Sequence, residues 1–227
     1  IQEKSDYVLL PIVDAKGMLI GRMTIKDGFQ ILRESHDAEQ MARAGLSEDE
    51  DLFSPVWKSS MRRATWLGIN LLTAFLASWA IGLFEATLQQ VVALAVLMPI
   101  VASMGGIAGS QTLTLIIRGI ALGQISKGNL VPLLVKELSV GGFNGLLWAF
   151  AIGGIVAYWF SDMMIGIVIA SAIAINIVAA AFSGVLIPVL LDKMKIDPAL
   201  SGSVILTTVT DVVGFVTFLG LGTLFLL

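Results

Sequence analysis

After residue 63 the chain is apolar almost without interruption, and this pattern limits the fold more than any other feature of the sequence. A helix needs about 20 apolar residues to cross a bilayer. The stretches that reach this length are 64–84, 88–117, 130–160, 163–191 and 200–227. We therefore predict an all-α membrane protein in which residues 64–227 form five transmembrane helices per subunit.

The first 63 residues carry most of the charge and form a separate region. They contain eleven of the seventeen acidic and nine of the fourteen basic residues. The stretch LLPIVDAKGMLIGRMTIKDGFQIL predicts a strand, a turn at 14–17, a second strand and an amphipathic helix. We predict a short α/β element at 1–33 and a connecting helix and linker at 34–63. The net charge of −3 gives no reason to expect a nucleic-acid partner.

Basic residues in the short connections predict the orientation, because cytoplasmic loops collect Lys and Arg. The connections before the first span, after the second and after the fourth contain Lys58, Arg62, Arg63, Arg118, Lys127, Lys136, Lys193 and Lys195. The other two connections carry only Glu85 and Asp162. This distribution places the amino terminus in the cytoplasm and the carboxyl terminus outside.

Asp211 lies inside the last apolar stretch, in the run LTTVTDVVGF. A charge near the bilayer centre costs at least ~2.5 kcal/mol on insertion scales, so such residues usually mark the path of an ion, proton or substrate. Thr207 and Gly214 lie about one turn before and after Asp211, on the same helix face. Oxygen ligands of this kind suit Mg²⁺, which retains much of its water. We predict a hydrated divalent cation here; the alternative is a neutral or hydrogen-bonded Asp211 with a structural role.

The second apolar stretch contains PIVASMGGIAGSQTLT, whose proline and glycines weaken a helix. We expect the helix to be bent or broken after Pro99. Carbonyl groups freed near Gly105, Gly106 and Gly109 would then face a cation. Small residues at these positions also let helices pack closely, and the sequence leaves both interpretations open.

Further polar residues lie within or at the ends of the spans. Glu137 and Lys136 begin the third span and are expected near the cytoplasmic mouth. There Glu137 is either an entrance or gate residue or half of an interfacial ion pair. The amides of Asn70, Asn144 and Asn176 are expected to form hydrogen bonds between helices.

Several segments are similar to those of the MgtE magnesium channels, over essentially the whole chain. They are RRATWLGINLLTAF, PIVASMGGIAGSQ with the following RGIALGQI, KELSVGGFNG, and DPALSGSVILTTVTDVVGF. The resemblance implies a homodimer in the cytoplasmic (inner) membrane, with the pore between subunits and Mg²⁺ near Asp211, which matches the family's last-helix aspartate. The family's glycine-rich segment commonly reads GGNxG, whereas this chain has Ile107 at the asparagine position. The resemblance therefore supports cation transport more strongly than it supports selectivity for Mg²⁺ over Mn²⁺, Co²⁺ or Ca²⁺.

The resemblance also covers the charged region. Residues 1–33 look like the end of a CBS domain, and the helix that follows takes the position of the family's plug helix. Its carboxylates, including Asp37 and Glu39, would share Mg²⁺ with the pore mouth when the channel closes, so that Mg²⁺ is regulator as well as cargo. The alternative is a solvated helix followed by an acidic linker.

Functions other than a channel fit parts of the pattern. A proton- or sodium-coupled metal exchanger would use Asp211 as a relay, although no other carboxylate is expected deep in a span and no inverted repeat is visible. An intramembrane protease would need a second carboxylate or a histidine within the spans, and the sole histidine is His36. We predict no enzyme.

Five helices rarely enclose a polar path alone, so we expect a two-fold dimer with the second and fifth spans lining the pore.

Overall fold

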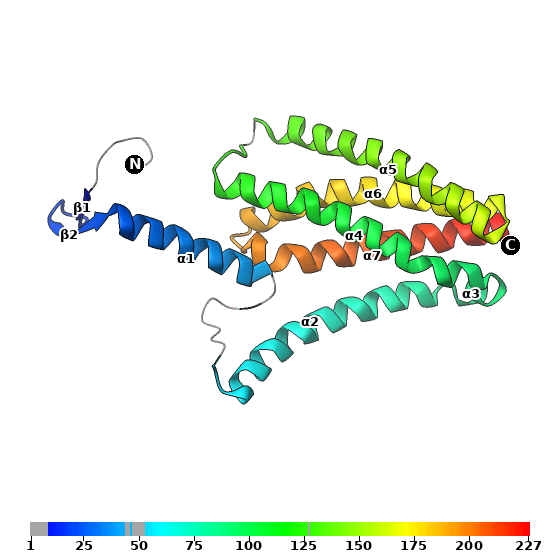
Figure 1. Cartoon of the computed structure of the whole chain (residues 1–227), viewed down its shortest axis with the longest axis horizontal. Helices are drawn as coiled ribbons and strands as arrows, with labels where there is room; N and C mark the ends of the chain where they lie inside the picture. The colour runs from blue at the N-terminus through cyan, green and yellow to red at the C-terminus, as the bar shows by residue number, and fades with distance from the viewer. Residues whose placement is uncertain (1–8, 44–45, 47–52, 127) are drawn as a thin grey trace. The chain divides into compact units, whose positions relative to one another are not determined.

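The structure is a computed structural model that describes residues 9–43, 46, 53–126 and 128–227. Contacts between Cα atoms divide the chain into two units, Ile1–Arg63 and Ala64–Leu227. Figure 1 shows the order of the elements along the chain. Each unit is described separately below.

The first unit begins with the antiparallel pair of β1 (Leu9–Val13) and β2 (Leu19–Thr24). The carboxylate of Asp14 accepts hydrogen bonds from two backbone N–H groups of the connecting turn, each at 2.9 Å. Gly17 has a φ of +82°, which a residue with a side chain rarely adopts. The strand, turn and strand predicted from this stretch are therefore present.

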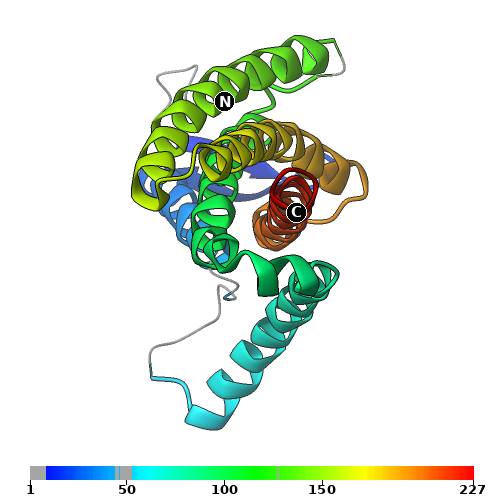
Figure 2. The same ribbon diagram turned by 90° about the vertical axis from the view of Figure 1, so that its right-hand side faces the viewer.

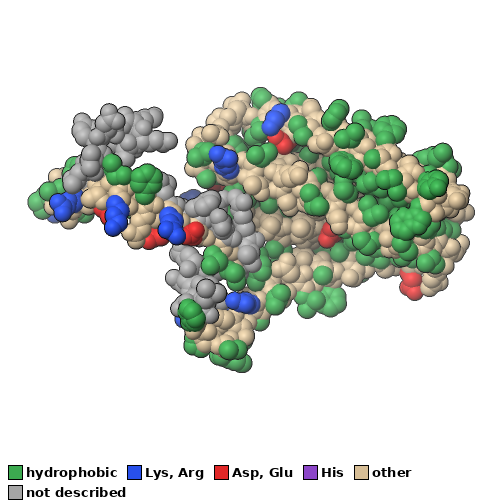
Figure 3. Space-filling model, in the orientation of Figure 1, with side chains coloured by type: hydrophobic (Ala, Val, Ile, Leu, Met, Phe, Trp, Pro, Cys, Tyr) green, Lys and Arg blue, Asp and Glu red, His purple; other side chains and the backbone are tan. Residues whose placement is uncertain are grey.

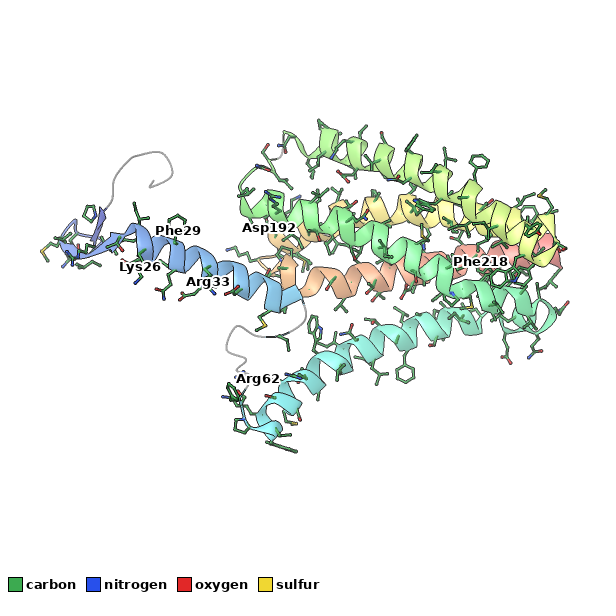
Figure 4. All side chains as sticks on the ribbon, viewed as in Figure 1. Lys26, Phe29, Arg33, Arg62, Asp192 and Phe218 are labelled. Atoms are coloured by element: carbon green, nitrogen blue, oxygen red, sulfur yellow. The ribbon has the colours of Figure 1, made fainter. Side chains whose placement is uncertain are left out.

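Helix α1 (Ile25–Arg43) follows β2 directly and begins with a reciprocal cap. The backbone N–H and the hydroxyl of Thr24 both donate to the Asp27 carboxylate at 2.8 Å, while the Asp27 N–H donates to the Thr24 hydroxyl at 3.3 Å. The bonds from the Thr24 amide and then its hydroxyl hold the pKa of Asp27 below its ordinary value. Figure 4 labels Lys26, Phe29 and Arg33 along this helix. Residue 34, the expected start of the connecting helix, lies inside α1.

The second unit is built of helices. They are α2 (Val56–Gly82), which begins in the first unit, α3 (Glu85–Gln90), α4 (Val92–Ala121), α5 (Leu130–Phe160), α6 (Met163–Lys193) and α7 (Pro198–Leu226). Among the described residues, α2 and α4 to α7 are the five helices long and apolar enough to cross a membrane. The prediction of a helical membrane protein with five such helices is confirmed.

The bounds of the first two spans differ from the prediction. The helix expected at 64–84 begins eight residues earlier and ends at Gly82, and the helix expected from residue 88 begins at Val92. The six residues of α3 lie between them as a separate short helix. Hydropathy alone could not place these bounds, because the turn of Leu83 and Phe84 is itself apolar.

The helix expected to be bent or broken after Pro99 is not broken, because α4 is continuous from Val92 to Ala121. A neighbouring helix supplies polar contact at this level, because the side-chain Nδ2 of Asn176 in α6 donates to the backbone carbonyl of Val101 at 3.0 Å. Transmembrane helices tolerate Pro and Gly where neighbours satisfy the backbone in this way. The glycines of α4 therefore sit in regular helix.

Helix α6 is the centre of the bundle and packs on α4, α5 and α7, as the views in Figures 1 and 2 agree. Its contact with α5 is close because small residues repeat every four positions along α5: Gly141, Gly145, Ala149 and Gly153. A Cβ at Gly145 would lie 3.2 Å from the carbonyl oxygen of Ala174. This is the small-xxx-small pattern of membrane helix pairs.

The core of this unit lies where α4, α6 and α7 meet. Leu97 of α4, Ile173 of α6 and Phe218 of α7 are fully buried there. Figure 4 shows Phe218 near one end of the bundle and Asp192 at the other. Figure 3 shows apolar side chains over the visible face of the helices, with basic side chains gathered at the end where α4 connects to α5. On this face of the bundle the basic side chains therefore lie at one end of the helices.

Candidate functional site

A groove of about 870 Å³ runs along α4 and reaches Thr207 of α7. Its lining is mostly apolar, but Ser103, Ser110 and Thr114, spaced seven and four apart, bring polar side chains to it, as does Gln111. Residues with this spacing share one helix face. The groove is also lined by Ile107, which is 59% exposed. Ile107 occupies the position at which the glycine-rich segment GGNxG has asparagine.

Asp211 lies in the middle of α7, one turn after Thr207. Its side chain is half-buried, and its carboxylate has no hydrogen-bond or ion-pair partner in the described part of the chain. The Thr207 hydroxyl donates to the carbonyl groups of Ser203 and Val204 at 3.0 and 3.1 Å. Its oxygen still has a lone pair free to accept, since a hydroxyl has two. Asp211 therefore offers an unpaired negative charge within a membrane helix, next to the residue that lines the groove.

The glycines predicted near the ion have two different surroundings. Gly106 faces the open groove, and a Cβ there would have no heavy atom within 4 Å. Gly105 and Gly214 are buried against Asn176, and Gly109 is buried against Leu206, whose Cδ1 would lie 3.0 Å from an added Cβ. Only Gly106 thus presents its backbone to the groove, and the other three make close helix contacts.

Asn176 was expected to bond between helices, and this is confirmed by its bond to Val101. The residue is fully buried, and its Oδ1 has no partner in the described part of the chain. Asn70 behaves differently, because its Nδ2 donates to Trp66 in its own helix at 2.9 Å. Asn144 has no hydrogen-bond partner in the described residues and lines a cavity instead.

Glu137 is buried, with only 4% of its surface exposed. It sits seven residues into α5, which is ~10 Å along the axis from Leu130. Its Oε1 pairs with Lys136 Nζ at 2.8 Å, and its Oε2 accepts from the Thr112 hydroxyl of α4 at 3.2 Å. Asp211 is therefore not the only carboxylate within the spans. The sequence suggests Thr112 as a source of a neutral oxygen but not its pairing with Glu137, because that pairing depends on how α4 and α5 align.

The candidate gate residues of α1 have fewer described contacts. Asp37 is exposed and lies 4.0 Å from Arg33 Nε, a surface pair that contributes little to stability. The Glu39 side chain and the acidic run at 48–51 lie outside the described residues. Within the described residues no three His, Cys, Asp or Glu side chains come together to hold a metal.

An unpaired carboxylate beside a polar groove in a five-helix bundle is typical of the membrane proteins that conduct or transport ions. Residues 98–221 match the family model MgtE, described as divalent cation transporter. The chain belongs to the MgtE family.

Relatives with assigned names match nearly the whole chain. The magnesium transporter MgtE of Thermus thermophilus is 32% identical over 227 residues, covering 97% of this chain and 49% of the relative. The magnesium transporter MgtE of Bacillus subtilis is 29% identical over 224 residues, covering 99% of this chain and 50% of the relative. The magnesium transporter MgtE of Enterococcus faecalis is 25% identical over 221 residues, covering 97% of this chain and 49% of the relative. The chain spans about half the length of the curated relatives it matches.

Proposed function

We propose that this chain is the membrane domain of a Mg²⁺ transporter that moves the ion through a pore between two subunits, with a hydrated ion held at Asp211. The observation that carries the proposal is the unpaired, half-buried Asp211 carboxylate, one helical turn after Thr207, which lines the groove along α4. A charge in this position is costly unless it meets water or a cation. Membership of a divalent cation transporter family and the names of the relatives support Mg²⁺ as the ion.

The openness of the groove supports the dimer. Ser103, Ser110 and Thr114 are exposed on the groove face of a helix that is long and apolar enough to cross a membrane. Polar groups facing lipid are unfavourable, whereas a second copy of α4 and α7 would enclose them around a water-filled path. Asp211 of each subunit would then face its twin, and the two carboxylates would balance the charge of one divalent ion.

The ligand set that we propose follows from the surroundings of each residue. Asp211 supplies the charge, while Thr207 and the backbone of Gly106 supply neutral oxygens toward the water shell of the ion. Gly105, Gly109 and Gly214 act by allowing α4, α6 and α7 to approach closely. This division agrees with the reluctance of Mg²⁺ to lose its waters.

The orientation remains the one predicted from the connections. The basic residues Arg118, Lys136, Lys193 and Lys195 lie at the ends of α4 to α7 that antiparallel packing brings to one side of the bundle. We propose that this side faces the cytoplasm, following the excess of Lys and Arg in cytoplasmic loops. The carboxyl terminus would then be outside. We also propose that α1, with Asp37 and Glu39, acts as a Mg²⁺-responsive plug and that a CBS domain ends near residue 33.

A coupled exchanger is the second candidate, and the burial of Glu137 favours it. A second carboxylate within the spans gives a proton or sodium ion a place to bind that Asp211 alone does not provide. A channel carries Mg²⁺ according to the membrane potential, while an exchanger also needs a gradient of the counter-ion.

The test is Mg²⁺ uptake into proteoliposomes under an imposed potential, comparing the unchanged chain with Asp211→Asn at equal incorporation. We expect the change to abolish uptake or its preference for Mg²⁺. Glu85→Asn, at an exposed helix end, is the matched control and should transport normally. Equal uptake by Asp211→Asn and the unchanged chain would refute the ion site, and uptake that follows a proton or sodium gradient instead of the potential would favour the exchanger.

A further inference from the structure

A polar cavity of about 370 Å³ lies between α4 and α5, with Ile177 and Ala181 of α6 also lining it. It exists because α5 packs along α6 and makes little contact with α4. Its polar lining is Gln111 and Thr112 of α4 and Asn144 of α5. The cavity adjoins the groove of the proposed pore, since Ile107 and Gln111 line both spaces.

The amides of this cavity need a partner that the chain does not provide. Neither Gln111 nor Asn144 forms a hydrogen bond with any other described residue. Both lie well inside helices that are apolar enough to cross a membrane. An amide without a partner is costly away from water, so the cavity must hold water or a hydrated ligand. At ~30 Å³ per water molecule, it has room for an ion with its hydration shell.

Glu137 adjoins the charged end of this cavity. The Thr112 hydroxyl, which belongs to the cavity wall, donates to Glu137 Oε2 at 3.2 Å. On its other side Glu137 lines a second space of about 390 Å³, which extends toward Gln124 in the α4–α5 connection. The buried carboxylate therefore lies between a polar cavity inside the bundle and a space that leads to the basic end of the helices.

Lys136 occupies the place that a cation would take on Glu137. Its Nζ lies 2.8 Å from Oε1, yet 61% of the Lys136 side chain is exposed, whereas only 5% of the Glu137 side chain is. The lysine can therefore turn into solvent on its flexible stem, while the carboxylate cannot. Without the lysine, Glu137 would be a buried charge with no ionic partner, which is unfavourable unless another cation replaces it.

We infer that Glu137 anchors a second cation site between α4 and α5. A hydrated divalent cation reaches it from the α4–α5 connection, replaces the Lys136 ammonium on the carboxylate, and has its water shell held by Thr112, Gln111 and Asn144. The identity of the ion rests on the proposed function, but the site itself rests on the cavity and the buried carboxylate. The site is distinct from the one proposed at Asp211.

The test uses Mn²⁺ as the probe, because it accepts the same oxygen ligands as Mg²⁺ and its free concentration is read by electron paramagnetic resonance. Binding is measured on the 227-residue chain carrying Asp211→Asn, so that the site of the proposed pore is already removed. Lys136→Met and Glu137→Gln are added separately, with Glu85→Asn as the control. The carboxylates of the amino-terminal unit are the same in all variants, so any Mn²⁺ that they bind cancels when the binding isotherms are compared.

We expect Lys136→Met to tighten one Mn²⁺ site per chain by roughly tenfold, because the competing ammonium is gone. Glu137→Gln should abolish that site, and Asn144→Leu should weaken it by ~10-fold through the lost contact with the water shell. An unchanged isotherm for either Lys136→Met or Glu137→Gln overturns the inference. If Glu137→Gln does not fold, the Lys136→Met result decides alone. Loss of Mg²⁺ flux in Asp211→Asn is a separate outcome and tests only the proposed pore.

Discussion

Replacing Gly105 with alanine should destabilise the bundle, because Asn176 has no room to move away. A Cβ on Gly105 would lie 2.7 Å from Cγ and 2.9 Å from Oδ1 of Asn176, distances that real Cβ atoms do not show. Gly214 closes the opposite side, since a Cβ there would lie 2.6 Å from Asn176 Nδ2. The amide is thus held between the backbones of α4 and α7.

The size of the effect follows from three contributions. Overpacking a tight contact costs about 1–3 kcal/mol. Displacing Asn176 also breaks its bond to Val101 and leaves buried polar groups unpaired, which costs about 1–3 kcal/mol more. Alanine is a better helix former than glycine and returns up to about 1 kcal/mol. The free energy of unfolding should therefore fall by roughly 1–6 kcal/mol in Gly105→Ala.

The adjacent residue provides the control. Gly106→Ala places a methyl group in open space, so it should leave the unfolding free energy unchanged or raise it by up to about 1 kcal/mol. Both variants are compared by thermal unfolding in the same detergent. Adding Asn176→Ala to Gly105→Ala should recover part of the loss, because the clash partner is gone. Equal stability of Gly105→Ala and Gly106→Ala would refute the proposed contact between Gly105 and Asn176.

Two other predictions concern helix starts. Asp162 caps α6 by accepting from the N–H groups of Met164 and Ile165 at 2.8 and 3.3 Å. Asp162→Ala should therefore lower the free energy of unfolding by about 1 kcal/mol, and Asp162→Asn should lower it much less, as measured by thermal unfolding. Equal losses of stability in the two variants would contradict the cap. The lowered pKa of Asp27 means that its contribution to α1 is complete above the unfolded-state pKa and is lost as the pH falls through the folded-state pKa. The amide resonance of Thr24 should follow this loss in the acid range, and a resonance that titrates equally in Asp27→Asn would exclude the cap.

The membrane helices could be predicted because hydropathy and length are local properties. The third span was predicted at 130–160 and lies there, since the polar residues Asn129 and Ser161 bound it on both sides. The start of α7 was placed two residues late, although Asp197 and Pro198 carry a helix-start signal. The Asp197 carboxylate accepts from the N–H of Ala199 at 2.8 Å, so capping chemistry would have given the correct start.

The division of the glycines was also present in the sequence, but in its periodicity. Gly105 and Gly109 are four residues apart and fall on the same α4 face as the buried Val101. Gly106 falls on the face of Ser103 and Ser110, which forms the polar groove. The run of small residues suggested a bent or broken helix. The 3.6-residue period of a regular helix instead places these glycines on two faces, one that packs against other helices and one that carries polar side chains.

Glu137 shows what the sequence could not supply. Its distance from the start of α5 indicated a position near the membrane surface, yet the structure buries it against Thr112. The cause lies in the packing of the helices. Helix α5 packs along α6 and makes little contact with α4, so the space between α4 and α5 can hold polar groups inside the bundle. Burial at this site depends on the alignment of α4 with α5, which brings together Thr112 and Glu137, 25 residues apart in sequence, and no local pattern encodes this.

Ile107 connects the two polar spaces and bears on how an ion would be selected. It lines both the groove next to Thr207 and the cavity next to Thr112, and it offers neither space a ligand atom. Asp211 lies one turn from Thr207 of the groove, and Glu137 accepts from Thr112 of the cavity wall. Glu137 offers one carboxylate, whereas the proposed dimer would bring two Asp211 carboxylates to one ion. A divalent ion needs six or more oxygen ligands, so under the proposed function water would complete its shell, and this would favour Mg²⁺, whose water shell is the most reluctant to leave.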